Sequence, residues 1–163
     1  MMKKVSSKNG RLGFYFQKRL VFSDAYRELT LSARDLLFMM ITELRYSNKK
    51  RKDGIDKQWT NNGEVSVTQS QFRKQLGYCR ETYLKARDQL IKVGFIRQTH
   101  RGGKGAGDRA KYEVLISANG IGVHNERWTE YPKKDWIDEI PEAKNQLIGT
   151  KTRWKKGESG RKL

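Results

Sequence analysis

Two short amphipathic segments, each closed by a glycine, stand next to each other in "QSQFRKQLGYCRETYLKARDQLIKVGFI". In the first, Phe72 and Leu76 fall on one helical face, and Gly77 supplies the left-handed residue that ends a helix. The second predicted helix spans residues 80–93 and ends at Gly94. Two helices joined by so tight a turn are typical of a helix-turn-helix.

Apolar residues elsewhere predict elements that pack against these two helices. The clearest is the helix in "LTLSARDLLFMMITELRYS", with Thr30 as its N-cap and an inward stripe at helical spacing. That stripe consists of Ala33, Leu36, Leu37, Met40, Ile41 and Leu44. Upstream, aromatic and apolar residues in "FYFQKRLVFS" predict a short strand or extended segment.

Further segments complete the order of elements. Residues 48–63 interrupt the pattern and predict a loop. Val65 and Val67 alternate as in a short strand, and Thr68 is the expected N-cap of a helix that begins at Gln69. After the second helix, "FIRQT" and "KYEVLI" predict two strands around a glycine-rich turn. This order is the layout of a winged helix-turn-helix, an α+β fold with a two-stranded β-wing.

The turn between these strands carries four glycines, Gly102, Gly103, Gly105 and Gly107. A dinucleotide-binding loop needs its glycines between a strand and a helix, and a P-loop needs Gly-Lys followed by Ser or Thr. Neither pattern fits, since the turn lies between strands and Lys104 is followed by glycine. We therefore expect the tip of a hairpin, which turns tightly and approaches a nucleic-acid groove closely.

The segment quoted first resembles the helix-turn-helix core of bacterial winged-helix regulators. The matching positions are Gly77, Tyr83, Ala86, Leu90, Gly94, Phe95 and Ile96, and "RGGKGAGDRAKY" is similar to their wing in kind. The likeness covers roughly residues 20–116 and is closest to winged-helix DNA-binding proteins of phages, plasmids and other mobile elements, some of them replication-initiator-like. One departure is Cys79, because that position usually holds a serine or threonine cap, and a thiol caps a helix poorly.

In a helix-turn-helix, the first turns of the second helix face base edges in the major groove. The candidates for base contacts are Arg80, Glu81, Thr82, Leu84 and Lys85. Arg80 is the strongest of them, because arginine can contact guanine with two hydrogen bonds. The candidates for backbone contacts from the preceding helix and the wing (100–111) are Thr68, Gln69, Ser70, Gln71, Arg73, Lys74, His100, Arg101, Lys104, Arg109 and Lys111. For the residues from Arg80 to Lys85, the alternative interpretation is an ordinary charged, solvent-exposed helix face, with Glu81 and Lys85 as an i, i+4 pair.

The formal net charge of +17 favours a polyanionic partner. The charge falls in blocks, since residues 73–116 hold eleven Lys and Arg against four Asp and Glu, and residues 45–60 hold six against two. One cysteine and two histidines give no zinc-ligand spacing, so neither a metal nor a cofactor is expected. Since no long apolar run or secretory signal is present, we expect a cytoplasmic bacterial protein, nucleoid-associated when bound, with no membrane partner.

Three parts are expected along the chain: a flexible basic arm over residues 1–13, a winged-helix DNA-binding domain over residues 14–116, and an aromatic C-terminal extension over residues 117–163 with a basic tail. The extension forms a dimerisation element, a docking peptide for a replication or transcription protein, or a wrap over the domain's own surface. In one hypothesis, its acidic residues between 135 and 142 pair with the basic surface and compete with nucleic acid.

The leading functional hypothesis is sequence-specific binding of double-stranded DNA, by a transcriptional regulator or a replication-initiation accessory protein of a mobile element. The alternative is a protein-interaction adaptor that uses the winged helix as a scaffold and its aromatic C-terminal segment for docking. An enzyme is not expected, because the sequence offers no cluster of carboxylates and no activated nucleophile. No small-molecule ligand is evident, and the formation of a homodimer stays open.

Overall fold

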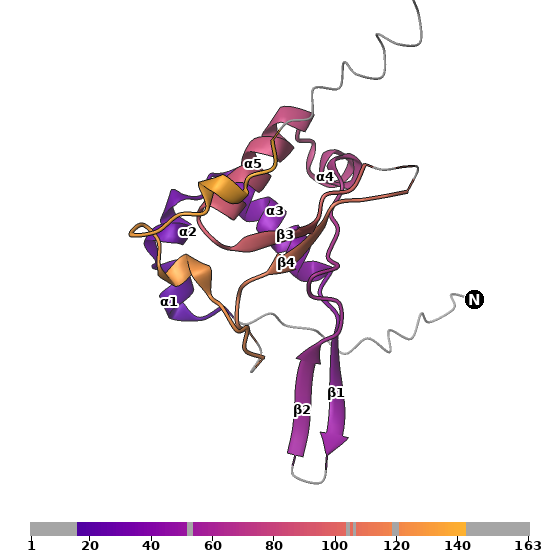
Figure 1. Ribbon diagram of the computed structural model, residues 1–163, viewed down its shortest axis with the longest axis vertical. Helices are drawn as coiled ribbons and strands as arrows, with labels where there is room; N and C mark the ends of the chain where they lie inside the picture. Colours follow the sequence, from indigo (N-terminus) through magenta and orange to yellow (C-terminus); the bar gives the residue numbers. More distant parts are fainter. Residues whose placement is uncertain (1–15, 52–53, 104, 106, 119–120, 143–163) are drawn as a thin grey trace, which may run out of the picture.

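A computed structural model describes residues 16–51, 54–103, 105, 107–118 and 121–142. The expected arm (1–13), Lys104 and residues 143–163 lie outside this part of the chain. Its elements are α1 (Lys18–Val21), α2 (Asp24–Glu28), α3 (Leu31–Thr42), β1 (Tyr46–Arg51), β2 (Gly54–Trp59), α4 (Gln69–Leu76), α5 (Arg80–Lys92), β3 (Ile96–His100), β4 (Lys111–Val114), η1 (Arg127–Thr129) and η2 (Ile137–Glu139). The fold is α+β: three main helices, α3 to α5, precede the antiparallel hairpin β3–β4 (Figure 1).

Helix α3 begins at the predicted cap and supplies the centre of the core. The Thr30 hydroxyl accepts a hydrogen bond from the backbone N–H of Ala33 at 3.4 Å. The Thr30 backbone N–H donates to the side-chain oxygen of Gln89 at 3.0 Å, which joins the start of α3 to α5. The predicted inward stripe is buried: Ala33, Leu36, Leu37, Met40, Ile41 and Leu44. Periodicity alone therefore located this helix and its buried face.

The segment before α3 is helical, and the predicted short strand was wrong. Residues 18–21 and 24–28 form α1 and α2, and Ser23 caps α2 by accepting a hydrogen bond from the backbone N–H of Tyr26 at 3.1 Å. The apolar alternation does not mark a face of a sheet, because Leu20 is buried whereas Phe22 is 60% exposed. Leu20 is the buried residue of α1, and Arg19 joins this turn to the extension by an ion pair with Glu126.

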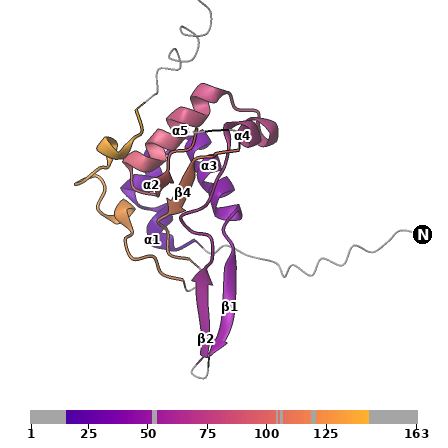
Figure 2. The ribbon, with the colours of Figure 1, turned by 45° about the vertical axis from the view of Figure 1, so that its right-hand side comes forward.

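Strands β1 and β2 form a hairpin where the sequence predicted a loop. They pair antiparallel from Tyr46 opposite Trp59 to Arg51 opposite Gly54. The two aromatic rings meet edge to face at the base, with centroids 6.3 Å apart. Figures 1 and 2 both show the hairpin projecting from the body, at the end away from α4 and α5.

The two glycine-terminated helices form as the sequence predicts. Gly77 and Gly94 have φ angles of 78° and 83°, in the left-handed region that favours glycine. Phe72 is buried on the inner face of α4. Leu76 is 42% exposed, so its predicted inward position was wrong, because the last turn of this short helix lies at the surface.

The hairpin β3–β4 follows α5 directly, as predicted. Ile96 pairs with Val114, and an irregularity in register lies between Gln98 and His100. Val65 joins the sheet by a single bridge to Tyr112, with hydrogen bonds of 3.2 and 2.8 Å in the two directions. The predicted strand around Val65 is thus reduced to this bridge.

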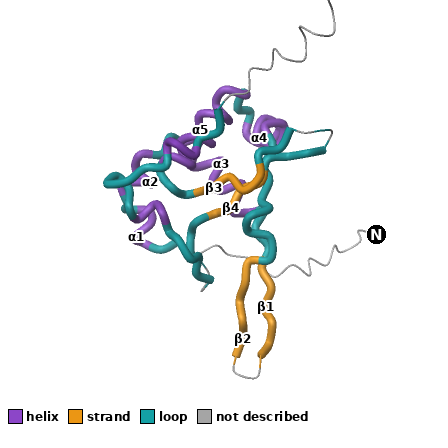
Figure 3. The backbone as a smooth tube through the Cα atoms, viewed as in Figure 1, coloured by secondary structure: helices purple, strands orange, loops and turns teal. Residues whose placement is uncertain are grey.

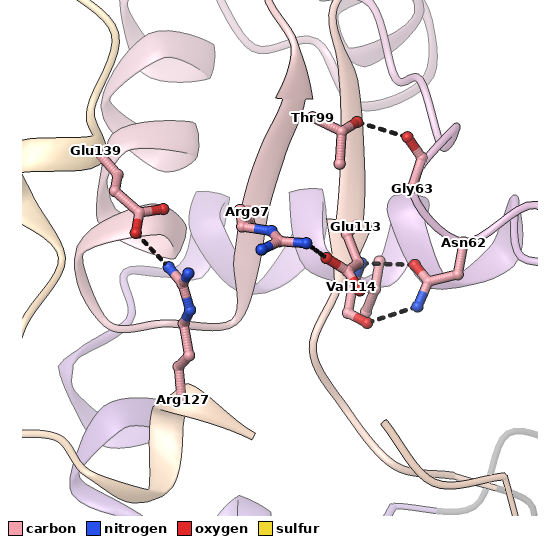
Figure 4. Close-up of polar contacts among 8 residues, drawn as sticks. All are labelled: Asn62, Gly63, Arg97, Thr99, Glu113, Val114, Arg127 and Glu139. Atoms are coloured by element: carbon pink, nitrogen blue, oxygen red, sulfur yellow. Dashed lines mark hydrogen bonds and ion pairs between the residues drawn. The ribbon is translucent and has the colours of Figure 1, made fainter. Parts of the chain in front are cut away.

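Residues 121–142 run over the body mostly as loop (Figure 3). Trp128 is buried and stacks on Phe95, with ring centroids 5.9 Å apart. The backbone N–H of Trp136 donates to the Lys92 carbonyl at 3.0 Å. Arg127 holds the two short helical turns together through an ion pair of 2.7 Å with Glu139 (Figure 4). This part of the extension therefore packs on the chain's own surface.

The extension packs directly against Gly94, the residue that ends the α5 segment. A Cβ atom there would lie 2.7 Å from the Arg127 Cβ and 2.8 Å from the Trp136 ring, whereas a Cβ at Gly77 would meet nothing within 4 Å. We expect Gly77→Ala to lower the free energy of unfolding by about 1–2 kcal/mol through backbone strain alone. Gly94→Ala should cost about 1–3 kcal/mol more, because it also overpacks the contact.

Urea denaturation of both variants measures the difference between them. Equal losses of stability would show that the extension does not bear on Gly94.

Candidate nucleic-acid interface

Helix α5 has one face fixed in the core. Its buried side chains are Tyr83, Ala86, Leu90 and Ile91. The Tyr83 hydroxyl donates a hydrogen bond of 2.7 Å to the Val67 carbonyl, which sets the rotation of α5 about its axis. Burial raises the pKa of Tyr83 above its ordinary value, so this phenol remains protonated and keeps its donor.

The predicted base-contacting residues lie on the opposite face of α5. Arg80, Glu81 and Lys85 are exposed, and Thr82 and Leu84 are half-buried. They occupy the first two turns of the helix, where a ridge of alternating charge faces solvent. The structure therefore leaves the five side chains accessible but does not align them: Arg80 and Leu84 face the β3–β4 hairpin, whereas Lys85 lies toward Thr30 at the start of α3.

An open groove of about 570 Å³ separates this ridge from the β3–β4 hairpin. It is lined by Arg80, Leu84, Arg87, Asp88, Gln98, Arg101, Gly102, Gly103, Ala110, Ile140, Pro141 and Glu142. Arginines thus reach it from both the helix and the hairpin. Arg87, which sequence reasoning missed, pairs with Asp88 at 2.6 Å, so its charge is partly compensated.

The N-terminus of α4 uses two of its predicted phosphate donors internally. The Thr68 backbone N–H donates to the Gln71 side-chain oxygen at 2.8 Å, and the Gln71 backbone N–H donates to the Thr68 hydroxyl at 3.2 Å. This capping box stabilises the helix start. Ser70, Arg73 and Lys74 are exposed, whereas Gln69 is half-buried. Ser70, Arg73 and Lys74 are therefore the predicted residues of α4 that remain accessible to a phosphate backbone.

The tip of the β3–β4 hairpin turns through glycines, as the sequence predicts. Gly102 has a φ angle of 70°, and a Cβ atom there would lie 2.5 Å from the Ala110 backbone nitrogen. No other residue fits this position, because the two chain segments pass too close together. The predicted turn is therefore present, and Gly102 is required both by its left-handed backbone conformation and by the close approach of Ala110.

Several predicted cations of the hairpin have partners within the chain. His100 lies 2.6 Å from Asp108, and Lys111 lies 3.3 Å from Glu64. Arg109 is exposed, and Lys104 lies outside the described residues. These pairings depend on tertiary structure, so the sequence alone overstated the positive charge of the tip.

Cys79 is the N-cap of α5 and makes no side-chain capping hydrogen bond. Its sulfur lies 3.2 Å from the Thr82 hydroxyl, and this contact lowers the pKa of the exposed thiol below its ordinary value. The start of the candidate recognition helix therefore lacks the usual side-chain acceptor, as the sequence indicated.

The C-terminal extension touches the candidate surface at one place. Ile140 lines the α5 groove and also a second groove of about 300 Å³ on the other side of α5. Arg101 donates a hydrogen bond of 2.8 Å to the Glu142 carbonyl, so the extension is joined to the hairpin. No local sequence pattern marks Ile140 or Glu142 as neighbours of α5. The first turn of α5 stays exposed beside them.

Compared with protein-family models, curated proteins and solved structures, the chain matches none of them. Within the described residues, no helix has the length and apolar content needed to cross a bilayer. No group of three or more His, Cys, Asp or Glu side chains in that same part of the chain could hold a metal ion.

The uncapped start of α5 gives a prediction about stability. Replacing Cys79 with Ser supplies a hydroxyl oxygen that can accept a hydrogen bond from a backbone N–H of the first turn. We expect this variant to be more stable than Cys79→Ala by about 1 kcal/mol in urea denaturation. Equal stability of the Ser and Ala variants would mean that packing, and not capping, decides where α5 begins.

Proposed function

We propose that the chain is a winged helix-turn-helix protein that binds a specific sequence of double-stranded DNA. It acts as a transcriptional regulator or a replication-initiation accessory protein of a mobile element. The observation that carries the proposal is the groove between α5 and the β3–β4 hairpin, with arginines on both sides. Three helices followed by a hairpin, with a bridge from Val65 to β4, match the element order of that fold.

In this proposal α5 enters the major groove with its exposed ridge forward. A major groove about 12 Å wide accepts one helix, and the N-terminal turns of a recognition helix contact base edges. Arg80 stands at the first position of α5 and is exposed, so it can make the paired hydrogen bonds that identify guanine. Leu84 lies one turn further on, on the face of Arg80, and Lys85 is exposed on the adjoining flank of α5.

The sugar-phosphate strand that borders the major groove then lies between α5 and the hairpin. Arg101 stands on the hairpin side of that groove, and Arg80 stands on the helix side. Arg73 and Lys74 on α4 contribute charge to the same backbone. These cations position the duplex without reading its sequence, and they make the affinity dependent on salt.

Arg80→Ala tests the proposal directly. Because Arg80 is exposed, its removal should leave the fold intact and weaken binding to a duplex selected from a random pool by about 1–3 kcal/mol, with a smaller effect on unrelated duplexes. Fluorescence anisotropy gives both affinities. Lys134→Ala is the control, because Lys134 is exposed and its ion-pair partner, Glu130, lies on the extension.

If Arg80→Ala and Lys134→Ala bind every duplex equally well, α5 does not read DNA. In that case, the adaptor function becomes the better account.

The contact of Ile140 with the candidate surface makes a second prediction. Ile140 lies over the middle of α5 beside Leu84 and Asp88, so its side chain limits how deeply the ridge can enter a groove. We expect Ile140→Ala to bind the selected duplex several-fold more tightly. Ile137→Ala is the matched control, because Ile137 belongs to the same segment and is 53% exposed.

Anisotropy titrations of the two isoleucine variants compare these effects. A weaker affinity for Ile140→Ala alone would instead make the extension part of the binding surface.

A further inference from the structure

The β1–β2 hairpin projects from the end of the molecule opposite to α4 and α5 (Figures 1 and 2). Each strand has six residues, so the arm extends about 20 Å. A two-stranded hairpin without further packing is marginally stable in water. We therefore looked for contacts that stabilise the base of the hairpin and for a binding function of its strands.

The support is found at the base of the arm. The Asn61 side chain accepts a hydrogen bond from the Arg45 backbone N–H at 2.7 Å and donates one to the Glu43 carbonyl at 2.8 Å. The Thr60 backbone N–H donates to the Arg45 carbonyl at 2.8 Å. These bonds close the base beside the aromatic pair and tie it to the end of α3.

A second set of bonds joins the base to the sheet behind the α5 groove. Asn62 makes two hydrogen bonds with the Val114 backbone, of 2.9 and 2.7 Å (Figure 4). The Thr99 hydroxyl donates to the Gly63 carbonyl at 2.5 Å. Residues 60–63 connect the arm to the segment before α4. Hydrogen bonds fix them both to the end of α3 and to the β3–β4 sheet, so the direction of the arm relative to that sheet is fixed.

The composition of the arm selects its partner. Residues 46–59 hold five Lys and Arg against two Asp, and Ile55 is the only aliphatic residue among them. Lys49, Lys50 and Arg51 are consecutive on β1, and Lys57 belongs to β2, so both strands of the hairpin carry cationic residues. Beyond the aromatic pair at its base, the arm therefore offers a partner little apolar surface to bury. A polyanion matches this net positive charge.

We propose that the β1–β2 hairpin is a second nucleic-acid-binding element, and that one chain bridges two DNA segments. The inference rests on the proposed function, because the first segment is the duplex on α5. A duplex seated on α5 lies at one end of the molecule, and the arm reaches away from it toward the other end. Lysine makes up four of the five cations of residues 46–59, so we expect the arm to contact mainly phosphates.

A bridging assay tests this inference with the full-length protein. One duplex is fixed to beads, and the capture of a second, labelled duplex is measured as protein is added. The arm variant carries Lys49→Gln, Lys50→Gln, Arg51→Gln and Lys57→Gln. The control variant loses the same charge at four exposed positions elsewhere: Lys18→Gln, Arg27→Gln, Lys133→Gln and Lys134→Gln.

We expect the arm variant to bind a single selected duplex within about twofold of the original protein, and to lose bridging by at least about tenfold. The control variant keeps both activities. Unchanged bridging by the arm variant would overturn the inference. So would an equal loss of bridging and single-duplex binding, because the arm would then contact the duplex on α5.

Light scattering on the same samples separates protein partners from DNA. If the arm variant loses both bridging and a dimer seen in the original protein, the arm is a protein interface and the inference fails. The proposed function fails separately: Arg80→Ala would then keep full affinity for the selected duplex, while the arm variant loses all DNA binding.

Discussion

The burial of one face of α5 is the constraint on which the rest of the structure depends. Tyr83, Ala86 and Leu90 are each buried, and the Tyr83 hydroxyl bond to Val67 fixes the helix about its axis. Because the rotation of α5 about its axis is fixed, the residues that it exposes to solvent are fixed as well. Arg80 and Lys85 are exposed because the face of the helix that carries Tyr83, Ala86 and Leu90 is in the core.

The same constraint explains how the hairpin and the extension are placed. Gly94 ends α5 in the left-handed region, and β3 starts two residues later beside the helix. The space above Gly94 admits no side chain, and Arg127 and Trp136 lie there instead. The groove and the segment that borders it therefore both follow from the end of a single helix. In the proposed complex, DNA and the extension compete for the ridge around Leu84.

Sequence patterns predicted the elements that are determined by residues close together in the chain. The stripe of α3, the capping and glycine termination of α4, and the glycine-rich turn each depend on residues a few positions apart, and each is present. The hairpin β1–β2 was missed although Asp53-Gly54 is a turn signal. Its lysines suppressed the alternation that marks strands, and its stability comes from Asn61 and Asn62 at the base.

The candidate site was predicted only in part, for a related reason. Exposure of the α5 ridge follows from helical periodicity, but partners such as Asp108 for His100, or the Glu142 carbonyl for Arg101, come from distant parts of the chain. No spacing rule reveals a neighbour forty-one residues away. The net charge therefore suggests a class of partner, but it does not reveal which cations are already paired within the chain.

The central claim is that the exposed ridge of α5 and the tip of the β3–β4 hairpin contact one duplex together. Backbone amide chemical shifts, followed by NMR as a selected duplex is added to the labelled protein, test it most directly. We expect the largest changes at residues 80–85 and 101–103, with none on the exposed side of α3 around Phe38. Changes that centred on α3, with α5 and the hairpin undisturbed, would contradict the account.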